Sequence, residues 1–360
     1  MAIQFDPQRW ERIRRTYEQW WSGTLDRPVI NIAVRRPKAD RPASVLPFRS
    51  FTSDYPLDAP AEQVIDSWDY ELSHLAFAGD AFPHVWVNFG PGVMAEFIGG
   101  RARVGDNTVW FGPARHVSID RLNLEYRPHS TFLDRIRSLS AAAVQRWGGG
   151  VQVSMTDLGG NLDMLSTFLE PGPLAMELYD HPEHVDRLLW QVHELWFRYY
   201  QELNGLLQPV NPGYSTWCPI LSDRPWYMLQ CDFAYMISPE MFRRFVRPEL
   251  SATCKRLGRA FYHLDGVGQL GHLDSLLEMP ELAGIQWVPG AGQEDFRHWP
   301  DVYRRIRAAG KLIQTYAWPL DTLDVLADQL GSAKGICIVG EVGENQQDDL
   351  MRMLEHYGAV

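Results

Sequence analysis

Cysteine is scarce in this sequence. The 360 residues contain four cysteines, at positions 218, 231, 254 and 337, and no two of them form a Cys-x-x-Cys pair. This excludes a disulfide scaffold and a Cys-rich zinc module, and it is typical of reduced thiols in a cytoplasmic protein. The chain also lacks any apolar run near the roughly 18 residues that a membrane-spanning helix needs, and its charged N-terminal segment lacks the apolar core of a signal peptide. We therefore expect a cytoplasmic protein with no membrane partner.

Positive charge is also in short supply. Lys and Arg number 34 against 45 Asp and Glu, which gives a formal net charge of −11. Recognition of nucleic acid needs a basic surface, so this balance argues against a nucleic-acid partner. Tryptophan, by contrast, is abundant, with 14 residues. We expect at least half of the tryptophans at strand ends and in loops to be core, and the others to line an apolar pocket for a ligand.

The second half of the chain alternates regularly between strand and helix patterns. After a strand at 260–265, strands are predicted at 284–288, 311–318 and 335–342, and helices at 299–309, 320–330 and 346–356. Strands separated by helices of this length indicate a parallel sheet. No repeat or linker divides the chain. We therefore predict one domain over residues 1–360, an α/β elaborated (β/α)8 TIM barrel.

The first half is less regular. Apolar residues at helical spacing predict helices over 7–22, 61–77, 131–147, 181–206 and 238–257. Strands are predicted at 27–34, 80–90 and 151–159, with strand ends at 210–217 and 228–232, and a loop over the barrel mouth at 35–60. The Gly-rich pattern between residues 91 and 127 predicts an inserted hairpin or excursion.

The stretch Ala260-Phe-Tyr-His-Leu-Asp-Gly266 is the centre of the predicted site. Side chains alternate faces along a strand, so His263 and Asp265 share one face near its C-terminal end. In a (β/α)8 barrel this end collects catalytic groups. The alternative is a His–Asp pair that only orients a loop.

Other polar and aromatic side chains fall at or near predicted strand ends. We take as further catalytic candidates Asp80, Asp157, Gln230 and Asp232. Candidate substrate-binding residues are Arg35, Arg36, Trp86, Trp217, Trp226, Gln286, Trp287 and Gln314. Each alone is more often a partner in a loop hydrogen bond or part of the core than a catalytic group, and it is their concentration at strand ends that indicates a site.

Several motifs resemble the uroporphyrinogen decarboxylase-like superfamily. They are Gly79-Asp-Ala-Phe-Pro83, Asp180-His-Pro-Glu-His-Val185, the segment from Gln230 to Phe242 with Phe245-Val-Arg-Pro248, and Tyr262-His-Leu-Asp-Gly266. The similarity runs over most of residues 60–360. It implies a TIM barrel that either decarboxylates its substrate or transfers methyl groups among corrinoid proteins, thiols and other carriers.

The resemblance also implies a metal site. Zinc methyltransferases of this superfamily carry His-x-Cys where this chain has His263-Leu-Asp265, and a further ligand comes from a later strand, where Glu341 stands. Carboxylates in place of thiolate favour a harder site for Zn, Mn or Fe. The predicted ligands are therefore His263, Asp265 and Glu341. The alternative is that His263 and Asp265 contact the substrate directly, without a metal.

Three functions stay open on the sequence. The leading one is a methyltransferase that moves a methyl group between a small molecule and a corrinoid or similar carrier on a partner protein. The resemblance implies a homodimer. The second is a cofactor-free decarboxylase or lyase for a polycarboxylate or cyclic substrate, using Asp80 with Arg35 or Arg36. The third is a non-catalytic barrel that binds a ligand or a partner.

Overall fold

A computed structural model describes residues 3–39, 41–105 and 108–360. The protein is α/β, with a central sheet in the order β2-β1-β11-β10-β9-β8-β7. Every neighbouring pair in this sheet is parallel except β1 with β2. The strands are β1 (Val29–Arg35), β2 (Leu75–Gly79), β7 (Tyr227–Leu229), β8 (Ala260–Asp265), β9 (Gly284–Val288), β10 (Leu312–Tyr316) and β11 (Ile336–Gly343).

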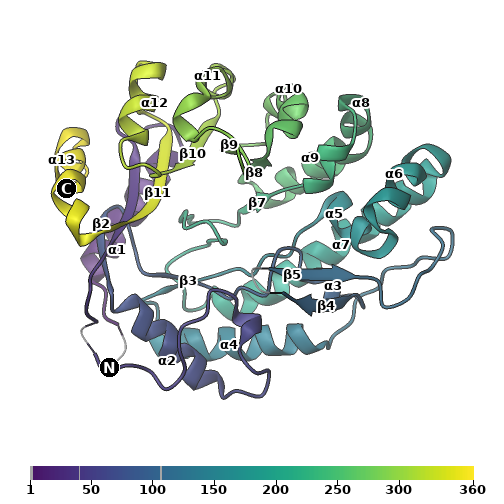
Figure 1. Ribbon diagram of the computed structural model, residues 1–360, viewed down its shortest axis with the longest axis horizontal. Coiled ribbons are helices and arrows are strands. Elements are labelled where there is room, and N and C mark those ends of the chain that lie inside the picture. The colour runs from purple at the N-terminus through teal and green to yellow at the C-terminus, as the bar shows by residue number, and fades with distance from the viewer. Residues whose placement is uncertain (1–2, 40, 106–107) are drawn as a thin grey trace.

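Two smaller strand pairs complete the β-structure. Strands β3 (His84–Trp86) and β6 (Gln152–Ser154) pair in parallel, and β4 (Arg101–Val104) and β5 (Val109–Gly112) form an antiparallel pair. The β4–β5 pair confirms the hairpin predicted within residues 91–127. In Figure 1 the β3–β6 pair and the β8–β11 part of the large sheet lie between two layers of helices.

Helices cover the outer side of the sheets (Figure 1). They are α1 (Pro7–Trp21), α2 (Ala61–Leu72), α3 (Met94–Phe97), α4 (Thr131–Trp147), α5 (Asn161–Leu169), α6 (Pro171–Asp180), α7 (Pro182–Leu207), α8 (Pro239–Met241), α9 (Arg247–Leu257), α10 (Leu273–Leu277), α11 (Pro300–Ala308), α12 (Thr322–Leu330) and α13 (Gln347–Tyr357). No helix in the described part of the chain is long and apolar enough to cross a membrane.

The C-terminal half follows the sequence prediction closely. Strands β9, β10 and β11 and helices α11, α12 and α13 lie within two residues of their predicted bounds. Alternation puts Tyr262, Ile285 and Ile313 on the outer face, where they are buried beneath the helices. Because both the strand period and the helix period are local properties of the sequence, this region needed no tertiary information to be predicted.

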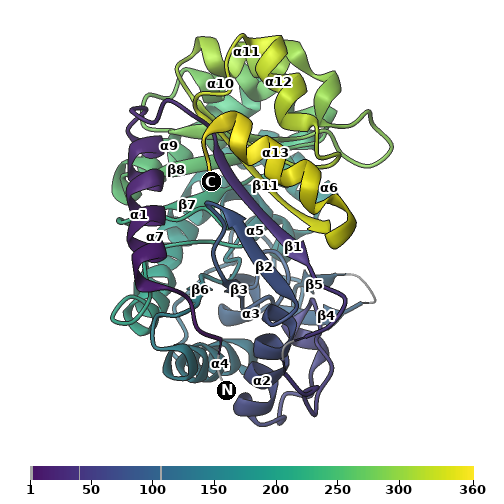
Figure 2. The ribbon, with the colours of Figure 1, turned by 90° about the vertical axis from the view of Figure 1, so that its left-hand side faces the viewer.

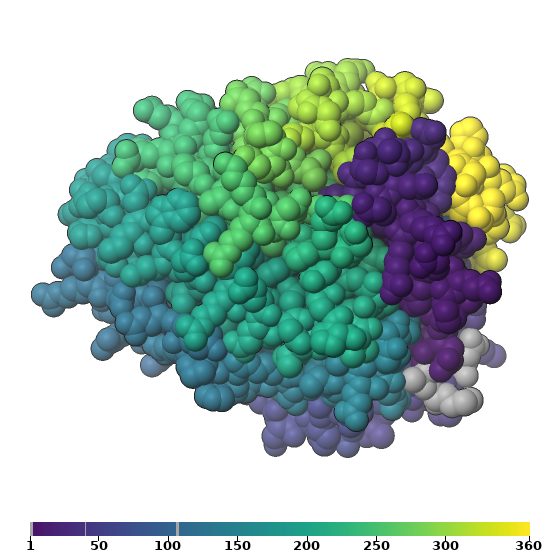
Figure 3. Space-filling view, turned by 180° about the vertical axis from the view of Figure 1, so that it is seen from behind, coloured from purple at the N-terminus to yellow at the C-terminus, as the bar shows by residue number. Residues whose placement is uncertain are grey.

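Helix α1 lies across the N-terminal ends of the strands (Figure 2). It begins where Asp6 caps the N–H of Gln8 and Pro7 occupies the first turn. Its buried face carries Trp10, Ile13, Tyr17 and Trp20, and Trp20 stacks on Phe261 of β8 with ring centroids 5.5 Å apart. The opposite face stays at the surface, as the view from behind shows (Figure 3). The helix thereby closes this end of the sheet with apolar side chains.

Two predictions about the first half were wrong. The helix expected over residues 61–77 ends at Leu72, and the next residues form β2, which runs antiparallel to β1. The strand expected at 210–217 is a loop with a single bridge between Tyr214 and Ser222. Residues 75–77 (Leu-Ala-Phe) are apolar, and a short apolar run does not distinguish helix from strand without its neighbours. The Asn-Pro-Gly sequence at 211–213, by contrast, is typical of a loop.

Candidate active site

His263 lies on the inner face of β8, with its side chain 16% exposed. Its Nδ1 is hydrogen-bonded to the Oε1 of Gln286 on β9, and its Nε2 lies 3.8 Å from Oδ2 of Asp265. The indole of Trp217 meets the imidazole edge-on, with ring centroids 5.3 Å apart. One ring nitrogen is thus held by a neighbouring strand, while the other faces the carboxylate of Asp265.

A row of amides behind His263 fixes its orientation. The side-chain N–H₂ of Gln286 donates to Oε1 of Gln314 and to the hydroxyl of Tyr316 at 3.1 Å, which leaves Oε1 of Gln286 as an acceptor. Gln314 in turn donates to the carbonyl of Thr315 at 2.7 Å. Because Nδ1 faces an acceptor, Nδ1 carries the single proton of the neutral ring. The unprotonated Nε2 can then accept a second proton.

Several carboxylates surround this imidazole. Burial raises the pKa of Asp157 to about 6, and hydrogen bonds from backbone N–H groups only partly oppose this effect. Burial also raises the pKa of Asp163 and of Asp232, and each is raised further by a neighbouring carboxylate. For His263, burial lowers the pKa, but the carboxylates of Asp265 and Asp232 outweigh it and the net shift is upward. We call His263, Asp265, Asp232, Asp157, Asp163 and Gln286 the His263 cluster.

Asp163 was missed at the sequence level. It lies in the first turn of α5, and its two carboxylate oxygens accept hydrogen bonds from the backbone N–H groups of Asp232, at 2.8 Å, and Phe233, at 2.7 Å. These bonds hold the start of the 3₁₀ turn over Asp232–Met236 against α5. The available signal was an acidic residue in the first turn after a Gly-Gly pair, a pattern also shared by ordinary helix starts.

Arg35 and Glu341 form a second group. The Nε of Arg35 lies 2.5 Å from Oε1 of Glu341, and its Nη2 lies 2.6 Å from Oε1 of Glu71. Together with Trp86 they line a pocket of about 390 Å³. His84 also lines this pocket, and its Nε2 lies 3.0 Å from the carbonyl of Thr216, next to Trp217. We call this hollow the Arg35 pocket.

The predicted metal ligands do not come together. Following the strand register from His263 through Gln286 and Gln314 leads to Cys337, four residues before Glu341 on β11. Strands β8 and β11 are separated by three spacings of about 4.8 Å, whereas ligands of one ion lie about 2 Å from it. No group of three or more His, Cys, Asp and Glu among the described residues lies where it could hold a metal. The set His263, Asp265 and Glu341 therefore does not fit one ion.

The structure places five further predicted residues outside the His263 cluster. Asp80 follows β2 and lies beside the start of β1, where it pairs with both terminal nitrogens of Arg27 at 2.7 and 2.9 Å. Trp226 is buried against Phe261 and Trp21. Trp287 lies on the outer face of β9 and packs on Trp299, because it alternates with the inward-facing Gln286.

Gln230 lines a small space with Gly159 and Trp196, between the sheet and α7. Arg36 follows β1 and lines surface hollows beside His74 and Arg41.

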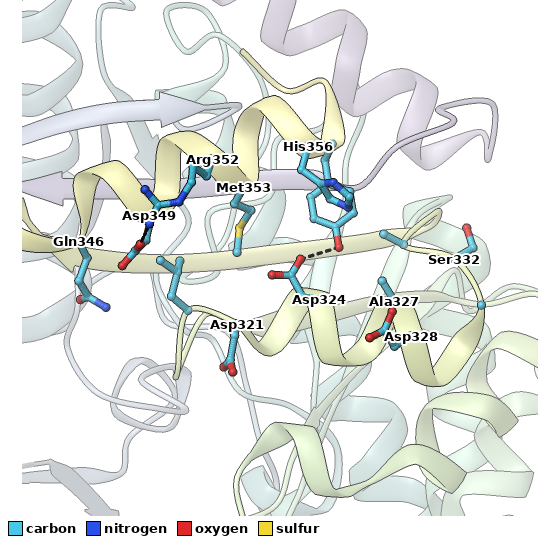
Figure 4. A pocket seen from close by; sticks show the side chains of 14 residues that line it. Asp321, Asp324, Ala327, Asp328, Ser332, Gln346, Asp349, Arg352, Met353 and His356 are labelled. Atoms are coloured by element: carbon cyan, nitrogen blue, oxygen red, sulfur yellow. Dashed lines mark hydrogen bonds and ion pairs between the residues drawn. The ribbon is translucent and has the colours of Figure 1, made fainter.

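A hollow of about 740 Å³ lies between α12 and α13 on the outside of the sheet (Figure 4). Its lining is acidic, and several of its carboxylates are already bonded: Asp324 to the hydroxyl of Tyr357 at 2.8 Å, Asp349 to Arg352 and Asp321 to Arg297. None of the predicted catalytic residues lines it. It is therefore separate from the His263 cluster.

Comparison of the chain with models of protein families, and with curated proteins, finds no match.

Proposed function

We propose that residues 1–360 form one elaborated (β/α)8 barrel of the uroporphyrinogen decarboxylase-like type, with the His263 cluster at its mouth. Two observations support the barrel proposal. Strands β7 to β11 and β1 are neighbours in parallel order, and polar side chains lie at the carboxyl ends of these strands. Because a fold does not fix an activity, the function must be argued from the cluster itself.

Our proposal for the activity is transfer of a methyl group from a small donor to a corrinoid or similar carrier that a partner protein brings. The observation behind it is His263, oriented by Gln286 and flanked by Asp265, with a pKa raised by neighbouring carboxylates. When the methyl–heteroatom bond breaks, its electrons stay on the heteroatom, and the protonated imidazole donates a proton there. The methyl carbon forms its new bond with an electron pair that the reduced carrier supplies.

The charge around His263 favours this over decarboxylation of a polycarboxylate. Asp157, Asp232 and Asp265 would repel a polyanion, whereas they would stabilise a neutral or cationic donor. Arg35, the cation expected for a polycarboxylate, is already bonded to Glu71 and Glu341.

Reduced cobalamin as the methyl acceptor tests this proposal. Purified protein is incubated with O-, N- and S-methyl donors, and methylcobalamin is followed by absorbance. Loss of a general acid typically costs about 10²–10⁴-fold in rate, so His263→Ala should fall by this amount. His298→Ala removes a half-exposed imidazole elsewhere on the chain and serves as the matched control. Release of carbon dioxide from carboxylate substrates, without methylcobalamin from any donor, would contradict methyl transfer and favour the lyase.

A further inference from the structure

The loop between β6 and α5 has an unusual backbone at consecutive residues. Gly159, Gly160 and Asn161 have φ values of 66°, 154° and 50°. A Cβ on Gly159 would lie 2.6 Å from the Cα of Gly92, so glycine is required there. Asn161 occupies the left-handed region, which asparagine tolerates better than most residues but which neighbouring contacts must hold.

A buried network supplies those contacts. Nδ2 of Asn161 donates to Oε2 of Glu249 on α9 at 2.5 Å, and Oδ1 of Asn161 accepts from the N–H of Leu162 at 2.9 Å. The other oxygen of Glu249 accepts from the hydroxyl of Thr253 at 2.6 Å and lies 2.8 Å from Nδ1 of His193 on α7. Glu249 is 7% exposed and Asn161 is 3% exposed. The carboxylate is therefore fully engaged, and it ties the loop to two outer helices.

The loop held in this way positions the carboxylates that face His263. Oδ1 of Asp157, before the loop, accepts from the N–H of Gly159 at 2.9 Å. Asp163, just after it, accepts from the backbone N–H groups of Asp232 and Phe233. A shift of the loop would move both Asp157 and Asp232 relative to the imidazole.

We propose that Glu249 is a positioning residue for the His263 cluster, acting through Asn161 on the loop that sets Asp157 and Asp232. Glu249 touches neither substrate nor His263. This role rests on the proposed acid–base function of His263, although the geometry of the cluster can be measured without turnover.

Two variants test the role: Glu249→Gln, which removes one of the acceptors, and Asn161→Gly, which keeps the left-handed backbone but removes the anchor. For each we expect kcat to fall by about 10-fold or more with KM changed by less than about 2-fold, because orientation and not binding is lost. The pKa of His263, read by NMR of histidine-labelled protein, should fall as carboxylates move away. A role in stability alone would change neither quantity in the folded protein.

The matched control is Glu278→Gln. It makes the same chemical change at a side chain that is 63% exposed and that pairs with Arg247 of α9, outside the network. If Glu249→Gln does not fold, the kcat and the His263 pKa of Asn161→Gly test the positioning role. Folded variants with the wild-type kcat and the wild-type His263 pKa would overturn the proposal. If wild type transfers no methyl group, the proposed function fails, and the His263 pKa alone tests the positioning role.

Discussion

Asp157 and Asp80 are two aspartates with almost the same burial and opposite surroundings. Asp157 is 4% exposed and lies beyond the carboxyl end of β6, among other carboxylates near His263. Asp80 is 3% exposed and lies beside the start of β1, where Arg27 binds both of its oxygens. Among the described residues no arginine is bonded to Asp157, and its pKa is raised to about 6, whereas Asp80 sits in a closed ion pair with Arg27.

The difference shows that burial alone does not mark a catalytic carboxylate. At the amino end of β1 the protein neutralises its buried aspartate, which also accepts from the N–H of Ile30 and so fixes the strand. Around His263 it leaves the buried Asp157 near the more exposed carboxylates of Asp232 and Asp265, an arrangement that costs stability and is typical of functional sites. Three variants test whether this difference between the two aspartates is real.

The largest effect is expected from Asp80→Ala. It leaves the guanidinium of Arg27 partly buried without its partner, and breaking such a pair costs about 3–5 kcal/mol. Urea denaturation should show this loss in the free energy of unfolding. The double variant Arg27→Ala/Asp80→Ala should recover part of it. A loss below about 1 kcal/mol would mean that the pair contributes little and that the contrast with Asp157 is not one of pairing.

Asp157→Asn should stabilise the protein, by a smaller amount and only at high pH. The folded pKa of about 6 lies above the ordinary value, so the folded state binds the proton more tightly and wild-type stability falls as pH rises from about 4 to about 7. The amide keeps an oxygen for the N–H of Gly159 and carries no charge. We expect a gain of about 1–3 kcal/mol at pH 8 and almost none near pH 4. Denaturation curves at both pH values check this; equal stability at pH 8 would contradict a raised pKa.

The smallest effect is expected from Glu341→Gln. Its ion pair with Arg35 lies at the surface, with the two side chains 41% and 40% exposed, and exposed pairs contribute about 0–1 kcal/mol. Thermal melts at low and high salt should show a loss in this range that shrinks as salt screens the charges. A much larger, salt-independent loss would mean that the carboxylate of Glu341 has a partner other than Arg35.

Much of the fold was predictable because it follows from local periodicity. The alternation from β8 to α13 and the shared face of His263 and Asp265 follow from neighbouring residues alone. The same alternation would have excluded Trp287 from the inner face, since it follows the inward-facing Gln286. Motifs on the sequence also pointed to the strand ends where polar groups gather.

Tertiary structure alone decided which charges meet. The sequence shows that Asp80, Asp157 and Glu341 follow or end strands, but strand pairing places Asp80 beside Arg27 and Glu341 beside Arg35. The antiparallel strand β2 reversed the expected end for Asp80, and the three strand spacings between β8 and β11 separated Glu341 from His263. Asp163 reaches the cluster only because α5 packs against the 3₁₀ turn that begins at Asp232. A residue's face is set by its neighbours in sequence, whereas its partners come from segments brought close by long-range packing, which no local pattern encodes.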